Sequence, residues 1–239
     1  MPRERFVIDN YYHVYNRGVE KLPIFTNDND RKRFVKALYL LNDTNVGSVH
    51  LSRLDEHIIS RKNRNPLVSV VSWCLMPNHF HLLLQQRVEG GISKFMQRLG
   101  IAYSMYFNTR YERSGVLFQG VFKSRAVMDE TYFTHLSRYI HLNPLELRYK
   151  NWEKNGVSDI DDAWDFLVNY HWSSLSAYLS DKKGGEQFFS KIIDEPSILF
   201  RLFENNPKQY KLFIENWIKK GLQGFDGNMF GTVKTKSRQ

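Results

Sequence analysis

The spacing of apolar residues changes repeatedly along the N-terminal part of the chain. Alternation is typical of a half-buried strand, whereas spacings of three and four are typical of a helix that buries one side. Phe34, Leu38 and Leu41, for example, form one stripe behind Asp30, a favoured N-cap residue. The pattern predicts elements in the order β-α-β-β-α-β-α, at residues 11–17, 30–41, 67–75, 79–84, 92–107, 115–127 and 129–142.

This order of elements is typical of an α+β sandwich of the ferredoxin-like type. We expect an antiparallel sheet with its helices on one face. The Pro77-Asn78 pair turns strand 67–75 directly into the next strand, so these two strands form a hairpin. The second strand of the hairpin is expected near the centre of the sheet, where it faces helix 129–142 across a groove.

Two stretches interrupt or follow this pattern. Residues 43–66 are rich in Asn, Ser, Lys and Arg and show little periodicity, which predicts an inserted loop. After residue 180 an Asp-Lys-Lys-Gly-Gly segment reads as a linker, residues 196–220 read as largely helical, and the last residues read as a flexible basic tail. We therefore predict a main domain at residues 1–180 and a C-terminal helical extension at residues 181–239.

The composition favours a nucleic-acid partner. The 34 Lys and Arg exceed the 25 Asp and Glu, which gives a formal net charge of +9, and a basic surface releases counterions when it binds a phosphate backbone. Cys74 is the only cysteine, which excludes an internal disulfide and a zinc-type cysteine cluster. The chain has no phosphate-cradling glycine loop, so no nucleotide cofactor is expected. No stretch resembles a signal peptide or a membrane span, and we expect a soluble cytoplasmic protein.

His79 and His81 are candidates for metal binding. Both belong to the second strand of the hairpin, so their side chains point to one face while Phe80 points to the other. Two imidazoles on a rigid strand can converge on one ion. The same alternation also occurs on half-buried strands that bind no metal, and the motif alone leaves both interpretations open.

Tyr139 and Asn143 are the matching candidates in the last predicted helix. Their spacing of four places a phenol and an amide on one helix face. Pro144 disfavours helical geometry at Asn143, so we expect the helix to end there. Tyr132 is a rival on the same face, but its place beside Phe133 at the start of the helix favours packing. A tyrosine nucleophile needs a cation nearby, because a phenol with a pKa of about 10 is protonated at neutral pH.

A wider set of motifs resembles the one-tyrosine HUH transposases, and within them the branch associated with repetitive extragenic palindromes (REP). In chain order the motifs are Tyr12-His13-Val14-Tyr15-Asn16-Arg17-Gly18, Ile24-Phe25 followed by Asp28, Asp30 and Arg31, Trp73 to His81, Gly115 to Ser124, Tyr139 to Pro144, and Trp172-Ser173-Ser174. Their order and approximate spacing fit the family over residues 11–180.

The resemblance implies a role for each candidate. It implies that His79, His81 and Asn143 bind Mg²⁺ or Mn²⁺, and that Tyr139 attacks a scissile phosphate to give a 5′-phosphotyrosine link and a free 3′-hydroxyl. The implied partner is single-stranded DNA with hairpin or palindromic repeats, and the implied assembly is a monomer or a homodimer. Imidazole suits Mn²⁺ better than Mg²⁺, and the sequence leaves the choice of ion open.

The resemblance also implies that basic residues surround a DNA path. Arg17, Lys123 and Arg125 are the implied contacts, and Arg138 directly precedes the candidate nucleophile. Each of these could equally be a solvated surface charge. Val121 stands where the family often carries arginine, so one expected contact is missing from this chain.

Two other functions stay open at this point. A non-catalytic regulator that binds hairpin DNA or RNA would use the same basic surface. A metal-dependent nuclease would use water as its nucleophile in place of Tyr139. Replacing Tyr139 by Phe separates the three, because the transposase stops joining DNA, the nuclease keeps cutting, and the regulator does not cut in either form.

Overall fold

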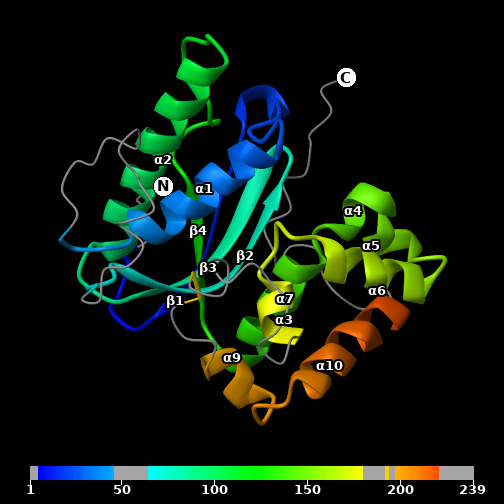
Figure 1. Cartoon of the computed structure of the whole chain (residues 1–239). Helices are drawn as coiled ribbons and strands as arrows, with labels where there is room; N and C mark the ends of the chain where they lie inside the picture. Colours follow the sequence, from blue (N-terminus) through cyan, green and yellow to red (C-terminus); the bar gives the residue numbers. More distant parts are fainter. Residues whose placement is uncertain (1–4, 46–63, 180–191, 194–196, 221–239) are drawn as a thin grey trace, which may run out of the picture.

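The computed structural model of the chain describes residues 5–45, 64–179, 192–193 and 197–220. At its centre lies a four-stranded sheet in which each neighbouring pair of strands is antiparallel (Figure 1). The strands stand in the order β2-β3-β1-β4 and span Val68–Met76, His79–Gln86, Tyr11–Arg17 and Lys123–Val127. The predicted antiparallel α+β sheet is thus confirmed, and the histidine strand β3 is one of its two central strands.

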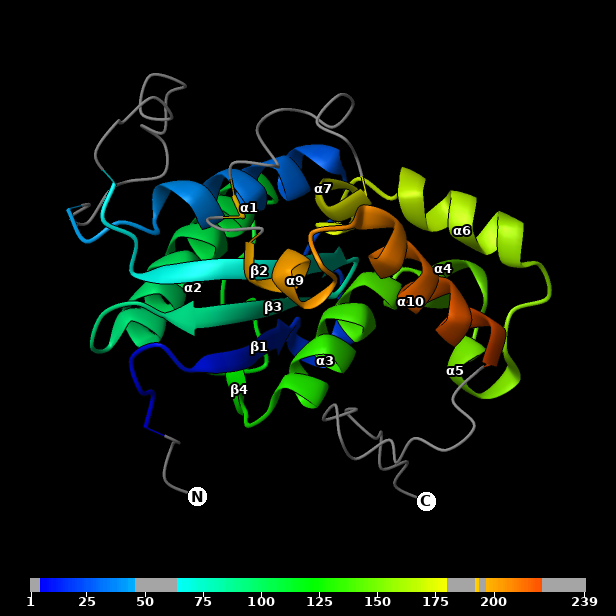
Figure 2. The same cartoon turned by 90° about the horizontal axis from the view of Figure 1, so that it is seen from below.

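Helices cover both faces of the sheet (Figure 2). The sequence had predicted helices on one face only, and this prediction was wrong. α1 and α2 lie on one face and α3 lies on the other; they span Asp28–Leu40, Gly91–Arg110 and Glu130–Leu142. The reason is visible in β3. Leu82 and Leu84 enter the core beneath α1 and α2, whereas Leu83 enters the core beneath α3. A continuous apolar run of this kind is typical of a strand covered on both sides.

Two elements differ from the prediction at their ends. α1 begins after Asn27, whose side chain caps the helix, while the carboxylate of Asp30 accepts a hydrogen bond from the backbone N–H of Asn27. Asp30 is therefore the third helical residue and not the N-cap. The last strand is much shorter than the predicted 115–127, because Gly115 and Gly120 adopt positive φ angles of 87° and 150° that break an extended run.

A further group of helices lies on the α3 side of the sheet (Figure 1). Helices α4, α5, α6, α7, α9 and α10 span Leu145–Arg148, Trp152–Asn155, Ile160–Asn169, Leu175–Leu179, Ser197–Leu202 and Pro207–Lys220. They share with α3 a core that includes Leu136, Ile140 and Ile214. The predicted helical segment 196–220 is thus two helices. The predicted linker and basic tail fall outside the described residues, so the boundary at residue 180 stays a prediction.

The predicted loop at residues 43–66 is described only at its two ends. The backbone N–H of Thr44 donates to the carbonyl of Asn65 at 2.8 Å. The side chain of Asn42 bonds the backbone N–H and carbonyl of Val68 at 2.9 and 2.7 Å. The segment that follows α1 and the segment that leads into β2 therefore lie next to each other.

In the described ranges, no helix is long and apolar enough to cross a membrane.

A buried polar network joins three elements on the α3 side of the sheet. His141 of α3 lies with Nδ1 at 2.6 Å from the hydroxyl of Tyr210 and with Nε2 at 2.7 Å from the hydroxyl of Ser174. Ser174 in turn accepts a hydrogen bond from the backbone N–H of Trp73 in β2 at 2.9 Å. Burial lowers the pKa of His141 to about 3. The ring is therefore neutral at pH 7, and both of its nitrogens are partnered.

Candidate active site

The two histidines of β3 face the helix α3. Phe80 between them is buried in the core under α1 and α2, and this orientation turns His79 and His81 toward the opposite face. Their ring centroids lie 5.1 Å apart and their planes are nearly perpendicular, at 89°. His81 is 6% exposed, whereas His79 is half-buried. The pair is therefore held by a central strand and remains accessible at one ring.

Tyr139 and Asn143 of α3 lie beside this pair. The ring of Tyr139 is 5.5 Å from that of His81. The side chain of Asn143 hydrogen-bonds His79 and also Tyr139, and its Nδ2 donates to the Tyr139 carbonyl at 2.9 Å. The structure thus brings together all four residues that the sequence assigned to the site. α3 ends with Asn143 as its C-cap, as predicted, but Asn143 itself keeps helical angles (φ −48°, ψ −40°) although Pro144 follows it.

Burial keeps the imidazoles of the site uncharged at neutral pH. It lowers the pKa of His79 to about 4, with a further contribution from the nearby Arg17 cation, while the hydrogen bond to Asn143 acts in the opposite direction. The pKa of His81 falls well below its ordinary value, first through burial and then through His13, His79 and Arg17. A neutral imidazole keeps a lone pair, which is the form that binds a metal ion.

The phenol of Tyr139 is also neutral in this environment. Burial raises its pKa, and the carboxylate of Glu153 raises it further, whereas the hydrogen bond to Asn143 and the charge of Arg17 lower it only in part. A neutral phenol is a weak nucleophile. Attack on a phosphate by Tyr139 therefore needs additional positive charge at this place.

The side chains present fit a divalent cation. Nδ1 of His79 lies 2.6 Å from Oδ1 of Asn78, and because an amide oxygen only accepts, Nδ1 carries the proton and Nε2 holds the lone pair. His79, His81 and Asn143 would then supply two imidazole nitrogens and one amide oxygen. Within the described residues there is no group of three or more His, Cys, Asp and Glu side chains that could hold a metal, so the amide of Asn143 is needed to complete this set.

The comparison with known protein families agrees with this geometry. Residues 9–143, more than half of the chain, match the model of the family described as IS200-like transposases. The chain belongs to this family. The matched segment contains His79, His81, Tyr139 and Asn143, and the match confirms the family resemblance drawn from the sequence. No curated protein matches the chain.

Among the solved structures that are similar to this transposase-family chain, one has a bound hairpin. It is the structure of a REP-associated tyrosine transposase bound to a REP hairpin, with 12% sequence identity and a TM-score of 0.45. The similarity covers 78% of this chain and 97% of that one. Members of the IS200-like transposase family are DNA-processing enzymes, and family membership assigns this general activity to the chain.

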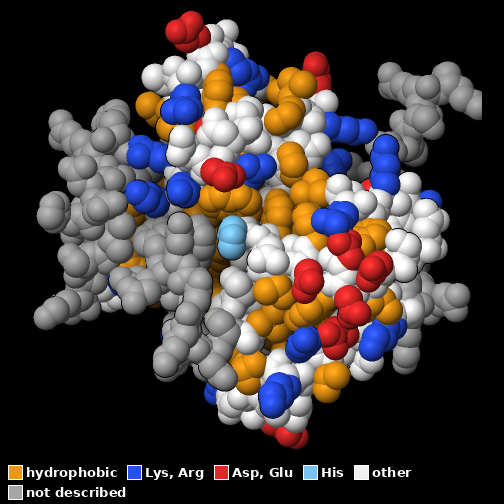
Figure 3. All heavy atoms as spheres, turned by 45° about the vertical axis from the view of Figure 1, so that its right-hand side comes forward, with side chains coloured by type: hydrophobic (Ala, Val, Ile, Leu, Met, Phe, Trp, Pro, Cys, Tyr) orange, Lys and Arg blue, Asp and Glu red, His pale blue; other side chains and the backbone are white. Residues whose placement is uncertain are grey.

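The basic residues predicted to contact DNA occupy different environments in this transposase. Arg17 ends β1 directly opposite His79, and its Nε is buried without a hydrogen-bond partner in the described part of the chain. Lys123 and Arg125 are exposed on the edge strand β4. Figure 3 shows one face of the molecule, on which Lys and Arg side chains gather above and Asp and Glu side chains gather at the lower right. The positive charge is therefore unevenly distributed.

Arg138 does not have the exposure that its predicted contact requires. Its side chain is buried, with 4% exposed, and its guanidinium lies 3.4 Å from the ring centroid of Trp217 and 4.4 Å from that of Phe213, both on α10. Burial lowers the pKa of Arg138 to about 9. Arg138 therefore links α3 to α10 in this structure, and its contact with nucleic acid stays a prediction that this burial does not favour.

Sequence reasoning assigned no role to His13, yet this residue lies in the site. It is fully buried in β1, its Nε2 is 2.8 Å from Nδ1 of His81, and its ring centroid is 6.2 Å from that of Tyr139. The rival Tyr132 is 8% exposed and packs in the core under α3. The available sequence signal was a histidine between an aromatic and an apolar residue of β1, which becomes informative only once β1 is paired with β3.

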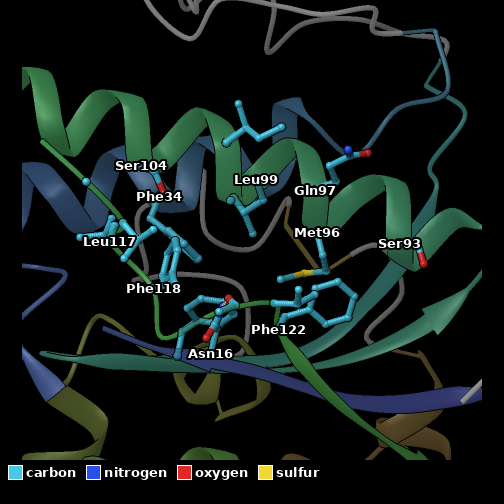
Figure 4. A pocket seen from close by; sticks show the side chains of 17 residues that line it. Asn16, Phe34, Ser93, Met96, Gln97, Leu99, Ser104, Leu117, Phe118 and Phe122 are labelled. Carbon is cyan, nitrogen blue, oxygen red and sulfur yellow. Dashed lines mark hydrogen bonds between the residues drawn. The ribbon is translucent and has the colours of Figure 1, made fainter. Parts of the chain in front are cut away.

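A cavity of 870 Å³ lies on the other side of the sheet, between α2 and residues 115–122 (Figure 4). It is lined mainly by apolar side chains, among them Phe118, Phe122 and Met96. Val121 lines it as well and is 71% exposed. The cavity is thus separated by the sheet from the face that carries Tyr139.

Proposed function

We propose that this chain is a metal-dependent transposase of single-stranded DNA that nicks and rejoins strands beside hairpins through a 5′-phosphotyrosine link. We place it in the REP-associated branch, on the motif resemblance found in the sequence. The observation that carries the proposal is the meeting of a half-buried tyrosine with two uncharged histidines and a shared asparagine. These groups come from a central strand and a helix that are separate in sequence.

In this proposal each residue has one task. The oxygen of Tyr139 forms a bond to the scissile phosphorus while the bond from phosphorus to the 3′ oxygen breaks, so the products are a 5′-phosphotyrosine and a 3′-hydroxyl. The phenol loses its proton and the leaving oxygen gains one. His79, His81 and Asn143 would hold the ion, which when bound supplies positive charge to the phosphate. Asn143 also fixes Tyr139 relative to His79.

The donor set favours Mn²⁺ over Mg²⁺ in affinity. Imidazole nitrogens suit a transition metal such as Mn²⁺ better than Mg²⁺, which prefers an all-oxygen octahedron. We therefore expect tighter binding of Mn²⁺ to His79 and His81, with Mg²⁺ able to support the reaction at higher concentration. Arg17 is the DNA contact closest to the reacting groups in this proposal, and Lys123 and Arg125 extend the positive path along β4.

The test is a covalent-adduct assay on the whole chain. Labelled single-stranded hairpin oligonucleotides are incubated with protein and Mn²⁺, and adducts that survive denaturation are counted on a gel and mapped by mass spectrometry. We expect an adduct on Tyr139 that disappears in Tyr139→Phe and persists in the matched control Tyr132→Phe. Cutting that survives in Tyr139→Phe would support the water-using nuclease, and binding without any cutting would support the regulator.

A further inference from the structure

His13 and His81 are joined by a buried hydrogen bond between two imidazoles. Nε2 of His13 lies 2.8 Å from Nδ1 of His81, and the rings are stacked with centroids 5.1 Å apart and planes 21° apart. The contact is diagonal across the central strand pair, because His13 stands opposite Leu83 and His81 stands opposite Tyr15. The contact between His13 and His81 therefore depends on which residues of β1 pair with which residues of β3.

One proton must lie between these two nitrogens. If His13 donates it, the second nitrogen of neutral His81, Nε2, carries the remaining hydrogen of that ring and has no lone pair to offer. If His13 accepts it, Nδ1 of His81 is the protonated nitrogen and Nε2 of His81 is left with its lone pair. The identity of the donor therefore decides whether His81 can bind a metal through the nitrogen that is not engaged by His13.

We propose that His13 is a positioning residue that accepts the Nδ1 proton of His81 and so directs the Nε2 lone pair of His81 toward the ion. This inference rests on the proposed function, because it assigns His13 to the metal site formed by His79, His81 and Asn143. Partners of this kind fix both the tautomer and the ring plane of a ligating histidine. Asn78 has the same relation to His79, with its Oδ1 at 2.6 Å from Nδ1.

A purely structural role for His13 explains the geometry less well. Nδ1 of His13 is buried and has no hydrogen-bond partner among the described residues, and an orphaned polar atom weakens a core that an apolar ring would fill at no such cost. His141 shows how this chain treats a structural histidine, since both of its nitrogens have partners at 2.6 and 2.7 Å. The hydrogen bond to His81 is thus the contact that accounts for an imidazole at position 13.

The first measurement reads the tautomer of His81 in the unaltered chain without metal. Ring-¹⁵N-labelled histidine distinguishes Nδ1–H from Nε2–H by NMR, and the His81 signals are assigned by their loss in His81→Gln. We expect the proton on Nδ1. A His81 ring protonated on Nε2 would overturn the proposal, and this result needs no variant of His13 to fold.

The second measurement compares Mn²⁺ affinity by calorimetry in two variants. His13→Phe keeps a ring but has no acceptor, and we expect its affinity to fall by about 10- to 100-fold. His13→Gln places an amide oxygen near the position of Nε2, and we expect affinity within about threefold of the unaltered chain, on the same argument. A folded His13→Phe protein that binds Mn²⁺ as tightly as the unaltered chain would refute the role of His13.

The two proposals fail in different ways. If the unaltered chain binds no Mn²⁺ or Mg²⁺, the metal-dependent function fails, and the tautomer of His81 still decides whether His13 is its acceptor. If the chain binds Mn²⁺ and forms the Tyr139 adduct but His13→Phe changes neither the tautomer nor the affinity, only the role of His13 fails.

Discussion

The two buried histidine clusters on the α3 side of the sheet resemble each other in charge and differ in their partners. Burial lowers the pKa of His13 and of His141 to about 3, so both rings are neutral. His141 uses both nitrogens and links α3 to α10 and β2. One nitrogen of His13 has no hydrogen-bond partner among the described residues, and its partner His81 lies next to the half-buried His79. A lowered pKa therefore does not distinguish these two histidines, whereas their hydrogen bonding does.

The largest expected effect is a loss of activity that occurs when the cluster of His13 and His81 is changed and does not occur when the cluster of His141 is changed. His81→Gln should reduce formation of the Tyr139 adduct by about 100-fold or more, because even the partners of metal ligands are worth 10- to 100-fold. His141→Gln is the matched control, since it makes the same substitution in the other cluster. Adduct yield per folded molecule is the measurement, and equal losses in the two variants would contradict the distinction between the clusters.

The next effect is a loss of stability that is expected when the His141 cluster is changed. His141→Phe keeps a buried ring but leaves the hydroxyls of Tyr210 and Ser174 without their histidine partner, and we expect it to lower the free energy of unfolding by about 2–4 kcal/mol. Urea denaturation measures this change. Affinity for Mn²⁺ should be unchanged in the folded variant, and a variant that binds Mn²⁺ tenfold more weakly would show that the clusters are coupled.

A smaller effect tests the attachment of α10 to α3. Trp217→Ala removes the ring that lies 3.4 Å from the Arg138 guanidinium, and we expect a loss of about 1–3 kcal/mol in the free energy of unfolding. Leu212→Ala on the same helix is the control, because Leu212 is 55% exposed and should cost less than about 0.5 kcal/mol. Equal losses of unfolding free energy in the two variants would indicate that the contact between Arg138 and the Trp217 ring does not stabilise the protein.

The last comparison concerns pH dependence, and over any one pH unit its effect is a modest change of slope. The pKa of His141 is about 3 in the folded chain and has an ordinary value of 6.5. Between these values the unfolded chain binds the extra proton, so stability falls as the pH falls from 6.5 toward 3. His141→Phe should show a slope in this window that is shallower by about 1.4 kcal/mol per pH unit, which is the effect of one proton. An unchanged slope in urea titrations would contradict a neutral buried ring.

The sequence predicted those parts of the site whose spacing is local. His79 and His81 share a face because a strand alternates, and Tyr139 and Asn143 share a face because a helix turns in 3.6 residues. The structure brings these pairs together, and their chemical roles stay predictions. His13 could not be found this way, since its contact depends on how β1 pairs with a strand far along the chain.

Other differences also arise from tertiary contacts. Arg138 looked like a solvent-facing charge because nothing near it in the sequence reveals that Trp217 covers it. Residues 181–239 were predicted as a C-terminal helical extension, and the contact of α10 with α3 depends on apolar residues far apart in the chain, such as Ile214 and Ile140. By contrast, the run from Leu82 to Leu84 already carried the information that both faces of the sheet are covered.

The register of β1 has a consequence for how the protein folds. β1 is made first but its partners come later, since Arg17 pairs with His79 and His13 pairs with Arg125. Contacts between such distant segments can form only after the later segment has been synthesised, and they slow folding. A partly synthesised or partly folded molecule therefore lacks an assembled site. In a protein proposed to break DNA strands, this timing would confine cutting to completed molecules and spare the cell from damage by folding intermediates.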